Sequence, residues 1–196
     1  MASDTTAQLI FDHLEASGLH ESHELLEIGY DSGARHSRPL AELHSGSYRF
    51  QQTDEFASTP AGPSGNRFDV SGFNTSFDVA VAQSVFAFLP FNDVRLCLYQ
   101  TAKVLGRNGC YYSTFFNSEL APPPADFANC YFSVNPLAPG PFSYSIDDLQ
   151  RAAAGLGWSV REVTDWLSPD GQQLACFRRR STIWAPRQAF GRRRRH

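Results

Sequence analysis

One segment near the N-terminus combines a carboxylate with closely spaced glycines. It runs from Glu27 to Gly33 with the sequence EIGYDSG and follows the apolar pair Leu25-Leu26. Glycines permit positive φ and let backbone N–H groups approach a bulky ligand, which suits a turn that cradles a nucleotide. Asp31 lies in the middle of the turn, and Asp tolerates a left-handed backbone better than most residues. The segment predicts a nucleotide-binding turn, with a turn kept for folding alone as the alternative.

A second candidate pair follows the apolar run 77–82, which reads as a buried strand. Gln83 and Ser84 come directly after it, at the edge where ligands of doubly wound folds bind. The amide of Gln83 can hydrogen bond a ligand there. Phe86 either stacks on that ligand or packs against the following helix, and the sequence leaves both interpretations open.

Groups that could act as a general base are scarce in the second half of the chain. Five of the six histidines precede residue 45 and the sixth is His196. The remaining candidates are tyrosines and one carboxylate, and packing is the more common use of such tyrosines: Tyr111, Tyr112, Tyr131, Tyr144 and Asp165. The sequence therefore names no catalytic base. It also shows no metal-ligand spacing, since its four cysteines lie far apart and read as reduced thiols.

Composition and charge indicate one acidic globular domain followed by a basic tail. The 196 residues are 42% hydrophobic, and no apolar run is long enough to span a bilayer. All 20 acidic residues but only 9 of the 17 Lys and Arg precede Arg178, which gives residues 1–177 a net charge of −11. An acidic body argues against a nucleic-acid groove, so only the Arg-rich tail could contact RNA. We expect one domain over 1–179 and a flexible basic tail over 180–196.

The elements that must position these residues alternate between strands and helices. Residues 118–142 are rich in proline and aromatics and predict a lid or surface loop, and Asp147-Asp148 is expected to open the last helix. We expect helices over 5–17, 38–43, 93–105 and 147–155, strands over 25–28, 48–51, 77–82, 110–116, 158–164 and 173–177, a loop over 55–66 and a turn over 106–109. This order predicts an α/β fold: a doubly wound, Rossmann-like, mostly parallel sheet with helices on both faces and a C-terminal antiparallel hairpin.

Taken in order, residues 22–180 resemble the class I S-adenosylmethionine-dependent methyltransferases. The most specific stretch runs from Phe77 through Leu89-Pro90 to Gly109, and it is similar to that family's fourth strand and the helix ending in a "VLRPGG" turn. The resemblance implies S-adenosylmethionine as cofactor. It carries the cofactor-binding roles to ten residues: Glu27, Gly29, Asp31, Gly33, Gln52, Asp54, Asp69, Ser71, Gln83 and Ser84.

The resemblance also exposes departures that divide the functional hypotheses. The family's middle glycine is Asp31 here, its ribose-binding acid aligns with Gln52, and the expected acceptor-side histidines are replaced by Phe88, Ser143 and Ser168. One hypothesis is a methyltransferase acting on oxygen or nitrogen of a small-to-medium molecule. The alternative is a catalytically inactive methyltransferase-like binding or scaffold protein. The lack of a leader pattern predicts a cytoplasmic location, and the oligomeric state stays open.

Overall fold

The computed structural model describes residues 2–28, 48–53, 70, 72–125 and 141–180. Its sheet has the order β2-β1-β3-β4-β7-β6, and the short β5 pairs with β4 beside this path. The elements are α1 (Ala2–Ala16), β1 (Glu24–Ile28), β2 (Arg49–Thr53), β3 (Phe77–Ala82), the 3₁₀ helix η1 (Val85–Phe88), α3 (Phe91–Val104), β4 (Leu105–Asn117), β5 (Ser143–Tyr144), α5 (Ile146–Ala153), β6 (Trp158–Leu167) and β7 (Gln173–Arg179).

Strand directions match the predicted architecture. β1 pairs in parallel with β2 and β3, and β3 pairs in parallel with β4. β7 then runs antiparallel between β4 and β6. The doubly wound sheet with a C-terminal antiparallel hairpin is therefore confirmed. The carboxyl ends of the parallel strands share one edge of the sheet, and β7 begins at that same edge.

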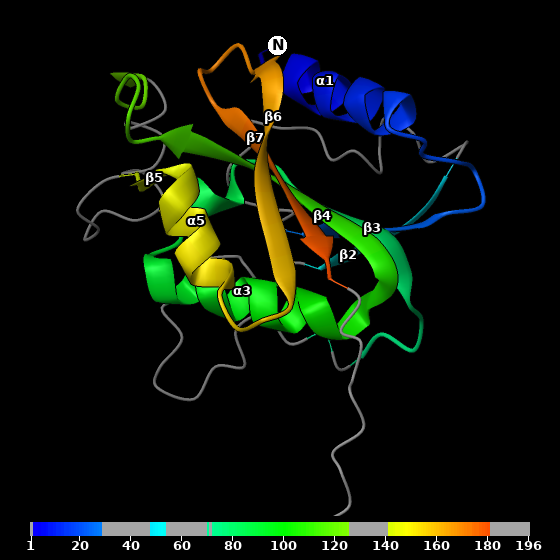
Figure 1. Ribbon diagram of the computed structural model, residues 1–196. Helices are drawn as coiled ribbons and strands as arrows, with labels where there is room; N and C mark the ends of the chain where they lie inside the picture. The colour runs from blue at the N-terminus through cyan, green and yellow to red at the C-terminus, as the bar shows by residue number, and fades with distance from the viewer. Residues whose placement is uncertain (1, 29–47, 54–69, 71, 126–140, 181–196) are drawn as a thin grey trace, which may run out of the picture.

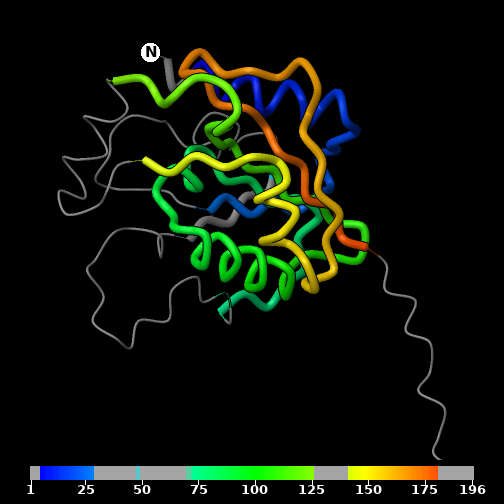
Figure 2. The backbone as a smooth tube through the Cα atoms, turned by 60° about the vertical axis from the view of Figure 1, so that its left-hand side comes forward, coloured from blue at the N-terminus to red at the C-terminus, as the bar shows by residue number. Residues whose placement is uncertain are grey.

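Helices cover both faces of the sheet. Figure 1 shows α1 on one side and α3 with α5 on the other, and the turned view in Figure 2 agrees. Each face has its own apolar cluster. The α3/α5 face is centred on residues such as Phe86, Leu98 and Phe177, and the α1 face on residues such as Phe11 and Leu174. Burial of these side chains is the main force holding the layers together.

β4 is the central strand of the C-terminal half because both of its faces are covered. Tyr111 is completely buried in the α3/α5 cluster, and the next residue, Tyr112, belongs to the α1 cluster. Side chains alternate between the two faces of a strand, so a doubly covered strand needs apolar residues at successive positions. Every residue from Tyr111 to Asn117 is buried, which explains why aromatic side chains occur in adjacent pairs there, Tyr111-Tyr112 and Phe115-Phe116.

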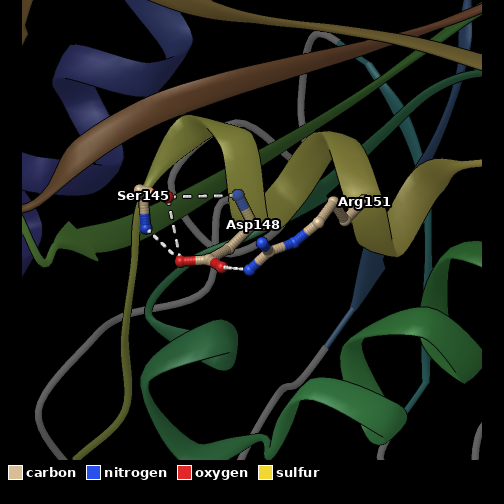
Figure 3. A network of polar contacts seen from close by, with 3 residues as sticks. All are labelled: Ser145, Asp148 and Arg151. Carbon is tan, nitrogen blue, oxygen red and sulfur yellow. Dashed lines mark hydrogen bonds and ion pairs between the residues drawn. The ribbon is translucent and has the colours of Figure 1, made fainter.

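α5 begins with a capping box rather than at the predicted acidic pair (Figure 3). The N-cap residue is Ser145, whose Oγ accepts a hydrogen bond from the Asp148 backbone N–H at 3.1 Å. The Asp148 carboxylate accepts in return from the Ser145 backbone N–H at 2.9 Å and pairs with Arg151. The Ser145 backbone N–H is the main reason that the pKa of Asp148 is lowered. A cap of this kind contributes about 1 kcal/mol to helix stability.

Several predicted boundaries need correction. The predicted 106–109 turn lies inside β4, which begins directly after α3 at Leu105 and shifts register against β3 between Phe77 and Val79. α3 begins at Phe91, two residues earlier than predicted, with Pro90 as its N-cap. β6 extends to Leu167, and η1 was not predicted. The predicted 38–43 helix, the 55–66 loop and much of the 118–142 segment lie outside the described residues.

Candidate functional site

The carboxyl edge of the sheet holds the predicted residues that the structure describes. Glu27, the penultimate residue of β1, pairs in register with Gln52 of β2 and with Val81 of β3. Only 6% of Glu27 is exposed. Its position near the end of β1 places Glu27 at the edge of the sheet where ligands of doubly wound folds bind.

The other predicted residues either lie at the same edge or lie outside the residues that the structure describes. Gln83 and Ser84 follow the last residue of β3, so the structure places them beside Glu27's end of the sheet. The remaining predicted cofactor residues stay predictions, because they lie outside the described residues: Gly29, Asp31, Gly33, Asp54, Asp69 and Ser71.

Ser84 has an unusual backbone conformation that its neighbours hold in place. Its φ is 60°, in the left-handed region that non-glycine residues enter at some cost. The Ser84 backbone N–H donates to Thr114 Oγ1 on β4 at 2.6 Å. The Ser84 Oγ accepts from Gln172 Nε2, just before β7, at 2.9 Å. Two other chain segments therefore hold the turn that contains Gln83 and Ser84 at the sheet edge.

Gln172 is a site residue that the sequence analysis missed. It is fully buried at the end of the β6–β7 connection. Its backbone is fixed to Ser168, whose N–H donates to the Gln172 carbonyl at 2.8 Å and whose Oγ accepts from the Gln172 N–H at 2.9 Å. The predicted hairpin of strands 158–164 and 173–177 was the available signal, because the connection between its strands ends at the carboxyl edge directly before the last strand.

The neighbouring polar pair extends this arrangement toward the end of β4. Asn117 Nδ2 donates to Gln173 Oε1 at 2.7 Å, and Asn117 Oδ1 accepts from the Glu119 backbone N–H at 2.9 Å. The side chains that we find at this end of the sheet are thus mainly neutral amides and hydroxyls. They can orient a polar molecule by hydrogen bonds but are poor proton acceptors at neutral pH.

The acceptor-side candidates for a base are placed away from this cluster or are engaged in packing. Tyr111 and Tyr112 lie in the two apolar cores, where burial raises the pKa of each phenol. Tyr144 donates its hydroxyl hydrogen to the Leu89 carbonyl. Asp165 is exposed on β6 with φ 62°, and Tyr131 lies outside the described residues. The packing interpretation of the described tyrosines is confirmed.

Phe86 also has a structural role. It is completely buried and its ring contacts those of Tyr111 and Phe177, with centroids 6.0 Å and 5.9 Å away. This settles the alternative between ligand stacking and packing in favour of packing. Within the described ranges, no group of three or more His, Cys, Asp or Glu is arranged to hold a metal ion. No helix in the same ranges is long and apolar enough to cross a membrane.

Comparisons with known proteins give structural but not sequence matches. No protein-family model matches the sequence. No curated protein matches it at a significant level either. Solved structures match with low identity. The magnesium protoporphyrin IX methyltransferase ChlM from Synechocystis PCC 6803, solved with bound SAM, superposes with a TM-score of 0.57 at 11% identity, over 91% of this chain and 80% of that one.

Two further structures extend this likeness. A SAM-dependent methyltransferase from Methanosarcina mazei gives a TM-score of 0.54 at 16% identity, covering 85% of this chain and 96% of that one. The S-adenosylmethionine-dependent methyltransferase SibL gives 0.56 at 11% identity over 89% of this chain. This chain spans only 54% of SibL's length. At these identities the likeness establishes the fold.

Proposed function

We propose that this chain, which has the class I methyltransferase fold, transfers a methyl group from S-adenosylmethionine to an oxygen or nitrogen of a small-to-medium-sized molecule. The observation that carries the proposal is the buried carboxylate of Glu27 at the carboxyl end of β1, between β2 and β3. Gln83 follows the neighbouring β3 and adds a neutral amide at the same edge. Doubly wound sheets bind ligands at this edge.

The residues at this edge fit the needs of such a cofactor. Its amino and hydroxyl groups present donors that a carboxylate and amide oxygens accept. When bound, the cofactor supplies a methyl group already activated by a positively charged sulfur. The protein must then mainly hold the two reactants in line, which is catalysis by proximity and alignment. The neutral hydrogen-bonding cluster of Ser84, Thr114 and Gln172 suits alignment without a general base.

Cofactor binding tests the proposal directly. Calorimetric titration with S-adenosylhomocysteine should show saturable binding, and Glu27→Gln should weaken it at least about tenfold, the effect of losing about 1.4 kcal/mol from a charge-assisted hydrogen bond. Glu24→Gln is the matched control, because Glu24 lies at the opposite end of the same strand. It should leave the affinity unchanged. Absence of heat at millimolar cofactor, or equal affinities for the two variants, would contradict the proposal.

A non-catalytic relative is the second candidate. It is favoured by the neutral character of the described acceptor-side cluster and by the histidines that are replaced by Phe88, Ser143 and Ser168. A ligand that binds only the folded state must raise the melting temperature. An unresponsive melting temperature would therefore favour this candidate. If Asp31→Gly then creates a response, the altered glycine turn is what limits the cofactor.

A further inference from the structure

One polar atom of the Gln172 side chain is buried without a hydrogen bond to replace its lost hydration. Its Nε2 is used by Ser84 Oγ, at 2.9 Å. Its Oε1 is buried and has no hydrogen-bond partner in the structure. Buried side-chain oxygens are nearly always hydrogen bonded, because the loss of hydration is otherwise uncompensated. The Oε1 atom is therefore an acceptor that awaits a donor, and the side chain that bears it is held firmly on its other side.

The position of this atom links it to the candidate site. Gln172 immediately precedes β7, and the first residue of β7, Gln173, pairs with Phe115 near the end of β4. The contact with Ser84 places the amide beside the turn that follows β3. Gln172 thus lies at the carboxyl edge, on the C-terminal side of β3. Glu27 lies at the same edge on the other side of β3.

Two exposed leucines lie at this same end of the sheet. Leu167, 59% exposed, ends β6 and pairs with Gln173. Leu120, 63% exposed, lies in the turn that follows β4, and its backbone N–H donates to the Asn117 carbonyl. Asn117 in turn donates to Gln173. Small-molecule sites are lined by apolar side chains with a few polar groups that fix orientation, and these two leucines lie at the same end of the sheet as Gln172.

We infer that Gln172 is a recognition residue for the methyl acceptor: its Oε1 accepts a hydrogen bond from an N–H or O–H of a neutral molecule whose apolar body contacts Leu120 and Leu167. This inference rests on the proposed function and adds the substrate class. An anionic group is disfavoured next to Oε1, because two hydrogen-bond acceptors would face each other. An apolar molecule without a donor would leave Oε1 uncompensated.

Matched pairs of small probes test the inference on the whole protein saturated with S-adenosylhomocysteine. Phenol and anisole differ by one methyl group, which removes the donor, and aniline and N,N-dimethylaniline differ in the same sense. Nuclear magnetic resonance titration should show that phenol and aniline bind about tenfold more tightly than their methylated partners. The same titration should shift the side-chain amide signal of Gln172.

Variants of Gln172 distinguish a role of its amide oxygen in binding from a role of the residue in folding. Gln172→Leu should remove the preference for donors, whereas Gln172→Glu, which keeps acceptor oxygens, should retain it. Gln150→Leu is the control, because Gln150 is an exposed residue of α5. Leu167→Ser should weaken both members of a pair equally. The wild-type pairs and Gln172→Glu decide the matter if Gln172→Leu does not fold.

The contradicting results are equally specific. Equal affinity for both members of each pair, no binding of either member up to its solubility, or a preference that persists in Gln172→Leu would overturn the inference. The titrations are repeated without S-adenosylhomocysteine. A donor preference that appears there, together with no heat from the cofactor, would refute the proposed function while supporting a binding role for Gln172.

Discussion

The two faces of β4 place the same pair of residue types in opposite chemical environments. On the α3/α5 face, the Tyr111 hydroxyl lies 3.5 Å from Cys97 Sγ, and both residues are completely buried. Burial raises the pKa of Cys97 to about 12. On the α1 face, Tyr112 pairs across strands with Cys176. There the pKa of the thiol falls to about 6, mainly through a hydrogen bond with Cys110.

Neighbouring charges explain much of the remaining difference. Cys176 on β7 pairs with Arg161 of β6, and Arg178 lies two residues further along β7, on the same face. Both guanidinium groups favour the thiolate and lower its pKa. No charged group contributes to the raised pKa of Cys97. Only its hydrogen bonds with Tyr111 and Thr101 lower the pKa against the effect of burial. A buried cysteine's chemistry therefore depends on the face to which its strand or helix turns it.

The largest expected difference is between the two thiols themselves. With Cys130 replaced by serine, ultraviolet titration should show one thiolate forming near pH 6, lost in Cys176→Ala, and another near pH 12, lost in Cys97→Ala. Cys110→Ala should raise the pKa of Cys176, because it removes the main stabilising hydrogen bond. A titration in which no thiolate forms below pH 8 would eliminate the contrast between the faces.

The same contrast has a consequence for stability. The pKa of Cys176 is lowered in the folded state, so its contribution to stability is fully present above the ordinary thiol pKa of about 8.5 and is lost as the pH falls through about 6. Denaturant unfolding should therefore show stability rising with pH across this window. The slope should be smaller in Cys176→Ala, and an unchanged slope would contradict the assignment.

Packing gives the next largest effect. Phe177 is completely buried on the α3/α5 face, where its ring lies 5.5 Å from that of Tyr111 and 6.4 Å from that of Trp158. Phe177→Ala should lower the free energy of unfolding by about 3–5 kcal/mol because it leaves a cavity among aromatic rings. Leu174→Ala, on the α1 face of the same strand, is the matched comparison. A cost for Phe177→Ala below that for Leu174→Ala would show that the aromatic cluster is not the tighter core.

The smallest expected effect lies at the surface of the α1 face. Burial is the main cause that lowers the pKa of His13, and the hydrogen bond with Cys110 is the main cause for Cys176, but the positive charge of Arg161 lowers both pKa values further. Arg161→Gln should therefore raise both pKa values, as followed by ultraviolet titration of the thiol and by nuclear magnetic resonance of the imidazole. Arg151→Gln on α5 is the control, because Arg151 pairs with Asp148 on the other face of the sheet. Unchanged values in Arg161→Gln would contradict the charge-based explanation.

Apolar and aromatic runs in the sequence predicted the central strands well, because a strand buried on both faces requires such a run. The apolar run 77–82 and the aromatic run after residue 110 form β3 and β4, as expected for strands buried on both faces. Boundaries were less accurate where tertiary contacts decide them. β4 begins at Leu105, since pairing with Phe77 of β3 extends the strand into residues that alone read as a turn.

The candidate site was predicted only in part, for a related reason. Glu27 lies one residue before the end of β1, and Gln83 and Ser84 follow β3, so their place at the sheet edge follows from strand order. Gln172 is 88 residues from Ser84 in the sequence, and nothing in the sequence around it distinguishes it from the neighbouring Gln173. Their roles differ because Gln173 bonds Asn117, whereas Gln172 turns toward Ser84.

The main strands and helices could be predicted in order from the sequence, as could the lack of a histidine at the acceptor-side positions Phe88, Ser143 and Ser168. These are properties of residue type and spacing along the chain. Tertiary contacts place Phe86 in the core, bring Gln172 to Ser84 and give Cys97 and Cys176 different acidities. Each of these properties depends on which side chains from distant segments come into contact, because those contacts determine the burial of a group and the charges near it.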